Sequence, residues 1–107
     1  MALYMYQVSY TPEAWAGLVK KPQDRARAIR PIIKNLKGRL ISFYLTFGES
    51  DAVIIAELPN NEAAAALSLA ATAGGAMKSI KTTPLMTMAE GMTAMRKAKG
   101  ASYKPPA

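Results

Sequence analysis

Apolar and polar positions follow two different periods along this chain, and the changes of period mark its structural elements. Residues 2–10, 40–47 and 51–58 are short apolar runs rich in aromatic or β-branched side chains, which is typical of strands. Residues 77–86 form a weaker fourth run. Pro84 within it predicts a strand at the edge of a sheet, because proline cannot donate a hydrogen bond to a neighbouring strand.

Helical periods separate these strands. Thr11-Pro12-Glu13 predicts a helix start, since it offers a capping hydroxyl, a proline at the first helical position and an early acid. Lys20-Lys21-Pro22 interrupts this helix, and a longer one is expected from residue 23 to Lys37-Gly38, where the glycine marks the end. An alanine-rich helix is expected over residues 63–73, before Gly74.

A last helix is expected over residues 88–98, because Thr87 and Glu90 have the spacing of a capping box. Its methionines lie on one helical face, which is typical of packing. The domain therefore spans residues 1–99, and residues 100–107 are predicted to be a disordered tail that is basic and rich in proline.

The order strand, helix, strand, strand, helix, strand predicts an α+β fold of the ferredoxin-like type. This is a βαββαβ sandwich in which helices cover one face of a four-stranded antiparallel sheet, here with an additional C-terminal helix. In the second strand, alternation predicts two sets of side chains on opposite faces: Ile41, Phe43, Leu45 and Phe47 on one, and Leu40, Ser42, Tyr44 and Thr46 on the other. Neither face is cleanly polar, so we expect a second copy of the chain over the uncovered face, in a homodimer or a higher oligomer of dimers.

The segment Gly48-Glu49-Ser50-Asp51 lies between the two central strand runs and predicts a tight hairpin with a positive φ at Gly48. With its flanks, from Arg39 to Pro59 and into the helix that follows, this segment resembles the GYD-domain family, and the likeness covers about residues 2–90. The resemblance implies a dimeric α/β barrel in which two ferredoxin-like sheets face each other. It implies no settled biochemical role, and Ser50 stands where the family's tyrosine is expected.

The composition removes several classes of chemistry. The 107 residues include no histidine and no cysteine, so there is no disulfide, no thiolate nucleophile and no imidazole base or metal ligand. The seven carboxylates are scattered along the chain without the spacing of a calcium loop. We therefore expect no metal site, no cofactor and no set of catalytic residues.

The net charge is +7, and its distribution is uneven. Eight cations lie within residues 20–39: Lys20, Lys21, Arg25, Arg27, Arg30, Lys34, Lys37 and Arg39. Such a patch fits nucleic acid or simply a solvated helix face, and we favour the solvated face. The first residues do not have the pattern of a signal peptide, and no apolar run reaches the length of a membrane span, so the expected location is the cytoplasm, away from membranes.

Three functions remain open. The favoured one is a homo-oligomeric module that binds or senses a small or anionic ligand between paired sheets. Its candidate ligand-binding residues are Tyr6, Tyr44, Thr46, Glu49, Asp51, Lys78 and Lys81. The alternatives are a cofactor-free enzyme like the monooxygenases of the same barrel architecture, with one of these acids or lysines as the base, and a protein that binds nucleic acid or a protein partner through the basic helix and tail. Asp51 also has a structural interpretation, as an acceptor of hydrogen bonds from its own turn.

Overall fold

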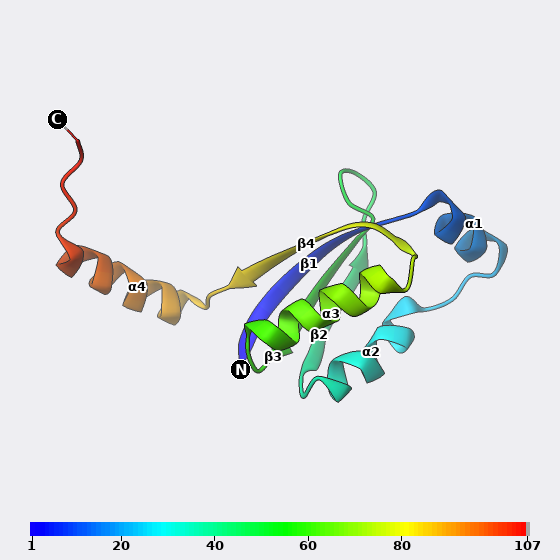
Figure 1. Ribbon diagram of the computed structural model, residues 1–107, viewed down its shortest axis with the longest axis horizontal. Helices are drawn as coiled ribbons and strands as arrows, with labels where there is room; N and C mark the ends of the chain where they lie inside the picture. The colour runs from blue at the N-terminus through cyan, green and yellow to red at the C-terminus, as the bar shows by residue number, and fades with distance from the viewer. Residues whose placement is uncertain (107) are drawn as a thin grey trace.

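A computed structural model describes residues 1–106 and shows one antiparallel sheet of four strands (Figure 1). The strands are β1 (Ala2–Tyr10), β2 (Arg39–Leu45), β3 (Ala52–Leu58) and β4 (Met77–Leu85). Their order in the sheet is β2-β3-β1-β4, so β1 and β3 are central and β4 is an edge strand, as Pro84 predicts. This is the predicted α+β arrangement of the ferredoxin-like type.

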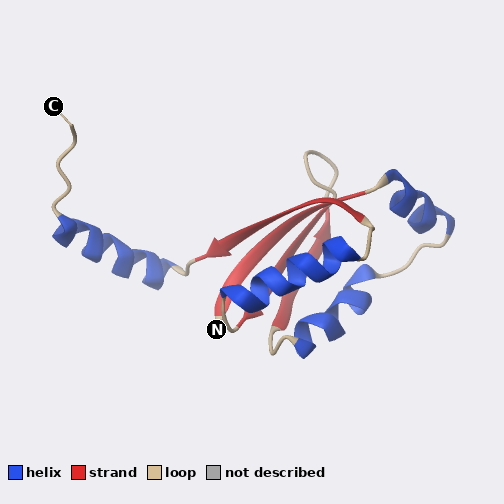
Figure 2. Cartoon of the chain, in the orientation of Figure 1, coloured by secondary structure: helices blue, strands red, loops and turns tan. Residues whose placement is uncertain are grey.

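Four helices accompany the sheet: α1 (Pro12–Lys20), α2 (Arg25–Asn35), α3 (Asn61–Ala73) and α4 (Met88–Ala101). Helices α2 and α3 lie over one face, which we call the covered face, while α1 lies beyond one end of the sheet (Figure 2). Helix α4 follows β4 and extends away from the sheet (Figure 1). The opposite face, which we call the open face, has no helix over it within residues 1–106.

The hydrophobic core lies between the covered face and its two helices. Alternate residues of β1 and β3 point into it and are at most 4% exposed: Tyr4, Tyr6, Val8, Tyr10, Ala52, Ile54, Ala56 and Leu58. Ile33 of α2 and Ala64 and Leu67 of α3 complete the buried set. Since strand side chains alternate between faces, every other residue of these strands is left on the open face.

A β-bulge in β2 corrects the predicted alternation. Leu40 pairs with Ala56 and Ser42 pairs with Ile55, so Ile41 is the additional residue. The bulge shifts the period by one residue. Leu40 therefore packs on the core together with Phe43, whereas Ile41 is exposed; alternation had placed Ile41 with Phe43 and Leu40 on the other face.

Two glycines have roles other than the predicted ones. Gly38 is needed for close approach, since a Cβ there would collide with the carbonyl oxygen of Glu57 and lie 2.5 Å from Leu58 Cδ2. The positive φ at this helix end belongs to Lys37, at 65°. Gly48 does not have a positive φ, and its turn is a six-residue connection between β2 and β3. The predicted tight hairpin is therefore wrong.

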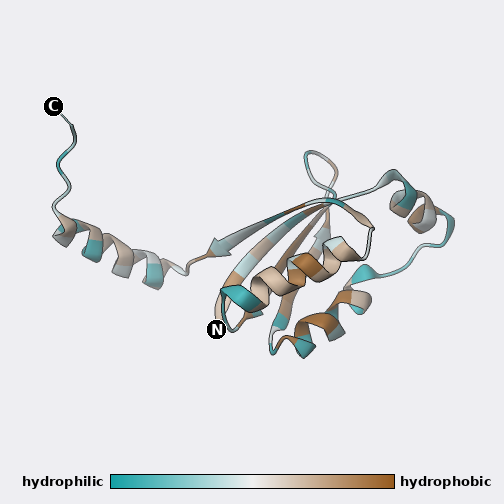
Figure 3. Cartoon of the chain, in the orientation of Figure 1, coloured by the Kyte–Doolittle hydropathy of each residue, from teal (hydrophilic) through white to brown (hydrophobic). Residues whose placement is uncertain are grey.

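Helix α4 differs from the prediction in length and in packing. The capping box is confirmed, with Thr87 and Glu90 exchanging hydrogen bonds, but the helix continues to Ala101. Met88, Met92 and Met95 are exposed, so the predicted packing is not made within residues 1–106. Figure 3 shows strongly apolar segments in α2 and α3 but not in α4. Gly100 and Ala101 belong to this helix, which corrects the predicted disorder at these two residues. The disorder of residues 102–106 stays a prediction, and Ala107 lies outside the described residues.

Candidate functional site

The open face presents rows of side chains that run across all four strands. The strand pairings align three rows in the order β2, β3, β1, β4: Arg39, Glu57, Leu3, Leu85; then Ser42, Ile55, Met5, Thr83; then Tyr44, Val53, Gln7, Lys81. The central positions of these rows are only half-buried. The middle row is apolar at its centre, and the two outer rows carry the charges.

The third row contains two of the predicted ligand-binding residues, Tyr44 and Lys81. Both side chains are exposed, and Val53 and Gln7 lie between them on the two central strands. Strands lie about 4.8 Å apart, so Tyr44 and Lys81 are roughly 14 Å apart across the sheet. One small molecule lying on a single chain therefore contacts one of these two residues, not both.

Tyr6 lies on the covered face, which corrects its assignment to a site between paired sheets. Its side chain is 1% exposed, and its hydroxyl donates a hydrogen bond of 2.8 Å to the carbonyl oxygen of Ala64 in α3. Burial, with a smaller contribution from Tyr4, raises the pKa of Tyr6 to about 12. Tyr6 is a core residue because the odd-numbered positions of β1, not the even-numbered ones, point to the open face.

The turn between β2 and β3 holds three further candidates, and two of them make structural contacts. Thr46 donates from its hydroxyl to the carbonyl oxygen of Ser50 at 2.6 Å, while Glu49 is exposed. Asp51 Oδ2 accepts hydrogen bonds from the backbone N–H of Tyr10 at 2.9 Å and from Trp15 Nε1 at 3.0 Å. The carboxylate thus ties the turn to β1 and α1. The expected bonds from its own turn are replaced by bonds to distant segments.

Lys78, the remaining candidate, lies at a second bulge. Ser9 pairs with Ser79 and Tyr10 pairs with Met77, which leaves Lys78 as the extra residue of edge strand β4. Its side chain is exposed, and it does not belong to any of the three rows of the open face. The structure therefore leaves Lys81 as the predicted lysine that stands on this face.

The predicted basic patch is divided into groups with different surroundings. Arg27, Arg30 and Lys34 line one shallow hollow on the outer side of α2 together with Pro31. Arg39 is paired with Glu57 at 3.2 Å, and Arg25 turns inward toward α3. Lys20 ends α1 and Lys21 caps it, while Lys37 occupies the connection to β2. The eight cations therefore do not form one surface.

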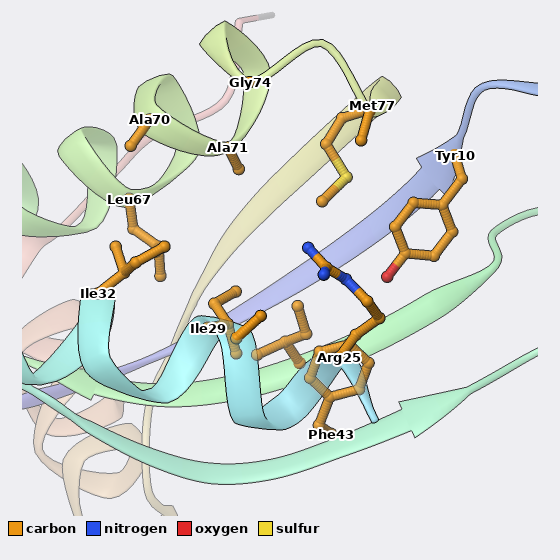
Figure 4. Close-up of a pocket in the computed structure, with 13 residues that line it drawn as sticks. Tyr10, Arg25, Ile29, Ile32, Phe43, Leu67, Ala70, Ala71, Gly74 and Met77 are labelled. Carbon is orange, nitrogen blue, oxygen red and sulfur yellow. The ribbon is translucent and has the colours of Figure 1, made fainter. Parts of the chain in front are cut away.

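A cavity of about 200 Å³ lies between α2 and α3 above the covered face, and the sequence reasoning did not identify it (Figure 4). Helix α2 packs on β2 while α3 packs on β3 and β4, and the two helices hardly touch each other within the described residues. The side chains that α3 directs toward this space include Ala70 and Ala71, which are too small to fill it. The sign of this cavity in the sequence was the run of alanines in α3, which also fits close packing of the helix on the sheet.

The described residues offer no cluster of three or more acidic side chains that would hold a metal ion. None of the helices within residues 1–106 has both the length and the apolar character needed to cross a membrane.

The sequence model of the GYD domain family matches residues 4–95. A search of curated proteins and a search of solved structures each give no match. Because the matched region covers most of the chain, the protein belongs to the GYD domain family.

Proposed function

We propose that this GYD domain is a homodimeric, non-catalytic binding module whose two sheets pack through their open faces. The observation that carries the proposal is the apolar centre of that face. Met5 and Ile55 lie side by side in its middle row, with Leu3 and Val53 in the rows on either side. An apolar patch at the centre of an uncovered sheet is favourable only when another surface excludes water from it. A second copy of the same face supplies that surface, and packed sheets bring such rows about 10 Å apart.

Helix α4 supports the same assembly. It has 14 residues and exposes three methionines on one side. Isolated helices of this length are marginally stable in water, so α4 requires a contact beyond its own chain. The second copy is the occupant we propose, since residues 40–77 carry four acids and no base, whereas α4 and the residues after it are basic.

The ligand we propose is a small anion held between the paired sheets beside Lys81. This side chain lies next to Gln7 on the open face, and no acidic side chain within residues 1–106 forms an ion pair with it. Burial by a partner sheet would strengthen the attraction between this cation and an anion, because the effective dielectric constant falls. Gln7, the neighbour of Lys81 in the same row, supplies hydrogen-bonding groups for the same ligand.

Size-exclusion chromatography with light scattering measures the molar mass of the protein and so tests the assembly. We expect twice the 11.5 kDa mass of one chain for the wild type, and a monomer for Ile55→Glu, because two buried carboxylates would face the partner sheet. Val19→Glu is the matched control: it also places an acid on an apolar position, but on exposed α1, and it should remain a dimer. A wild-type monomer at high micromolar concentration would refute the proposal.

The ligand is tested on the same protein by native mass spectrometry after mild purification. We expect the dimer to carry additional mass that Lys81→Gln loses while remaining a dimer. Lys78→Gln is the control, because Lys78 lies outside the rows of the open face. Additional mass that survives Lys81→Gln would contradict the assigned site and leave the dimer standing.

A further inference from the structure

The cavity between α2 and α3 lies on the covered face, so the packing of two open faces leaves it accessible. Its wall is formed by Ile29 and Ile32 of α2, Leu67 of α3, and Phe43 and Ile54 of the sheet (Figure 4). Unfilled space beside such side chains forfeits dispersion contacts and destabilises a core. A cavity that is apolar over most of its wall therefore gains from an apolar occupant.

Arg25 introduces one cation into this apolar surrounding. Its guanidinium projects into the cavity from the first residue of α2 (Figure 4). Its side chain is half-buried, and Nη1 donates to Gln23 Oε1 at 3.0 Å. No carboxylate within residues 1–106 forms an ion pair with it. A guanidinium has five N–H donors in a planar fork, so most of its capacity to bind an anion is unused.

Tyr10 provides the second polar group at the same end of the cavity. Three tyrosines of β1 point to the covered face, and two of them have hydroxyl partners: Tyr4 donates to Asn61 Oδ1 at 2.7 Å and Tyr6 to the carbonyl oxygen of Ala64. The hydroxyl of Tyr10 has no such partner among residues 1–106 and lies beside the guanidinium of Arg25 (Figure 4).

The position of Tyr10 is fixed. Its ring packs edge-on against Trp15, with 5.3 Å between ring centroids and 81° between planes. Burial raises the pKa of Tyr10 above its ordinary value; the positive charge of Arg25 offsets part of this increase, and the negative charge of Asp51 adds to it. The hydroxyl therefore stays protonated at neutral pH, so it can donate a hydrogen bond to an anion that Arg25 holds.

We propose that this cavity binds a small carboxylate with an apolar body. The carboxylate accepts hydrogen bonds from the guanidinium of Arg25 and the hydroxyl of Tyr10, and the body packs against Ile29, Phe43 and Leu67. Sites for drug-sized ligands measure about 300–1,000 Å³, whereas a cavity of roughly 150 Å³ is known to hold benzene. About 200 Å³ therefore fits a single ring or a short chain together with its carboxylate.

Three probes with the same ring and different charges test this assignment by NMR titration of the full chain. We expect phenylacetate to bind and to shift the amide signals of α2 and α3. The neutral phenylacetamide should bind at least about 10-fold more weakly, because hydrogen bonds to charged groups are the stronger ones, and the cationic phenethylamine should not bind. Equal binding of the acid and the amide would refute the role of Arg25. Shifts confined to the open face, or binding of none of the three probes at millimolar concentration, would refute the cavity as a site.

Two variants separate the charged end of the site from its apolar body. Arg25→Gln should weaken phenylacetate binding about 10- to 100-fold and leave phenylacetamide binding unchanged. Arg27→Gln is its control, since it removes the same charge from an exposed position of the same helix. Ala71→Leu should fill the space and abolish binding of both probes without lowering the melting temperature. Ala65→Leu is its control: it adds the same side chain on an exposed part of α3, and both probes should still bind. Unchanged phenylacetate binding in both Arg25→Gln and Ala71→Leu would overturn the proposal.

Discussion

On the covered face, alternate residues of β1 and β3 are buried beneath α2 and α3, while their immediate sequence neighbours on the open face are only half-buried. Tyr6 and Met5 show this difference within one strand. Both are large side chains on a central strand, but Tyr6 is enclosed within its own chain and Met5 faces a surface that the chain itself leaves open. The contribution of a strand residue therefore depends on the face it occupies. We expect residues of the covered face to determine folding and residues of the open face to determine association.

Truncation of these two neighbours should produce the largest contrast. Tyr6→Ala removes a buried aromatic ring and leaves a cavity, so we expect a loss of about 3–5 kcal/mol in the free energy of unfolding. This loss should be the same at every protein concentration. Met5→Ala should cost much less in dilute protein, and its cost should grow with concentration as the dimer contributes to stability. Urea unfolding at two protein concentrations measures both effects. A concentration-independent cost for Met5→Ala would contradict a role in association.

The two glycines near β2 extend the contrast to the backbone. Gly38 lies where the chain approaches β3, and a Cβ there would meet backbone as well as the Leu58 side chain. Gly38→Ala should therefore cost about 1–3 kcal/mol, the range found for overpacked sites. Gly48→Ala should be nearly neutral, because a Cβ at Gly48 has no atom within 4 Å and the residue has no positive φ. Thermal unfolding of both variants compares them, and equal destabilisation would show that close approach at Gly38 is not the cause.

The sequence allowed the order of elements, the edge position of β4 and the starts of α1 and α4 to be predicted, because each depends on a local signal; α2 and α3 begin two residues away from their expected starts, at Arg25 and Asn61. Pro84 has no backbone N–H, so it does not fit a central strand that is hydrogen-bonded on both sides. The side chains of Thr11 and Thr87 accept hydrogen bonds from backbone N–H groups in the first turn of a helix. Family membership was also recognisable, since the segment around Gly48 retains its flanking strands. These features required no knowledge of which distant residues meet.

The remaining features depend on distances between segments, which no local pattern encodes. The bulge at Ile41 shifts a period of two by one residue, and apolar residues on both sides of it conceal the shift. The partners of Asp51 lie 36 and 41 residues away in the sequence. The cavity beside Arg25 exists because α2 and α3 lie apart on the sheet, and the sequence shows the small alanines without the spacing between the helices.

The ionisation of Tyr6 offers the finest test of the covered face. Its folded pKa of about 12 lies above the ordinary tyrosine value of 10.0, because burial disfavours the phenolate. The unfolded chain therefore releases this proton first as the pH rises. The stability linked to Tyr6 is fully present below about pH 10 and is lost as the pH rises toward 12, by at most about 3 kcal/mol.

Tyr6→Phe separates this ionisation from the packing of the ring. At neutral pH it should cost about 1 kcal/mol, the value of a typical hydrogen bond, because the contact with the carbonyl oxygen of Ala64 is removed. This difference should shrink and then reverse between pH 10 and pH 12, since phenylalanine has no proton to release. The midpoints of urea unfolding of the wild type and of Tyr6→Phe, measured from pH 8 upward, give this stability difference at each pH. If the wild type and Tyr6→Phe lose stability in parallel over that range, the alkaline loss arises from other groups, and the hydroxyl of Tyr6 is not held in its protonated form by the core.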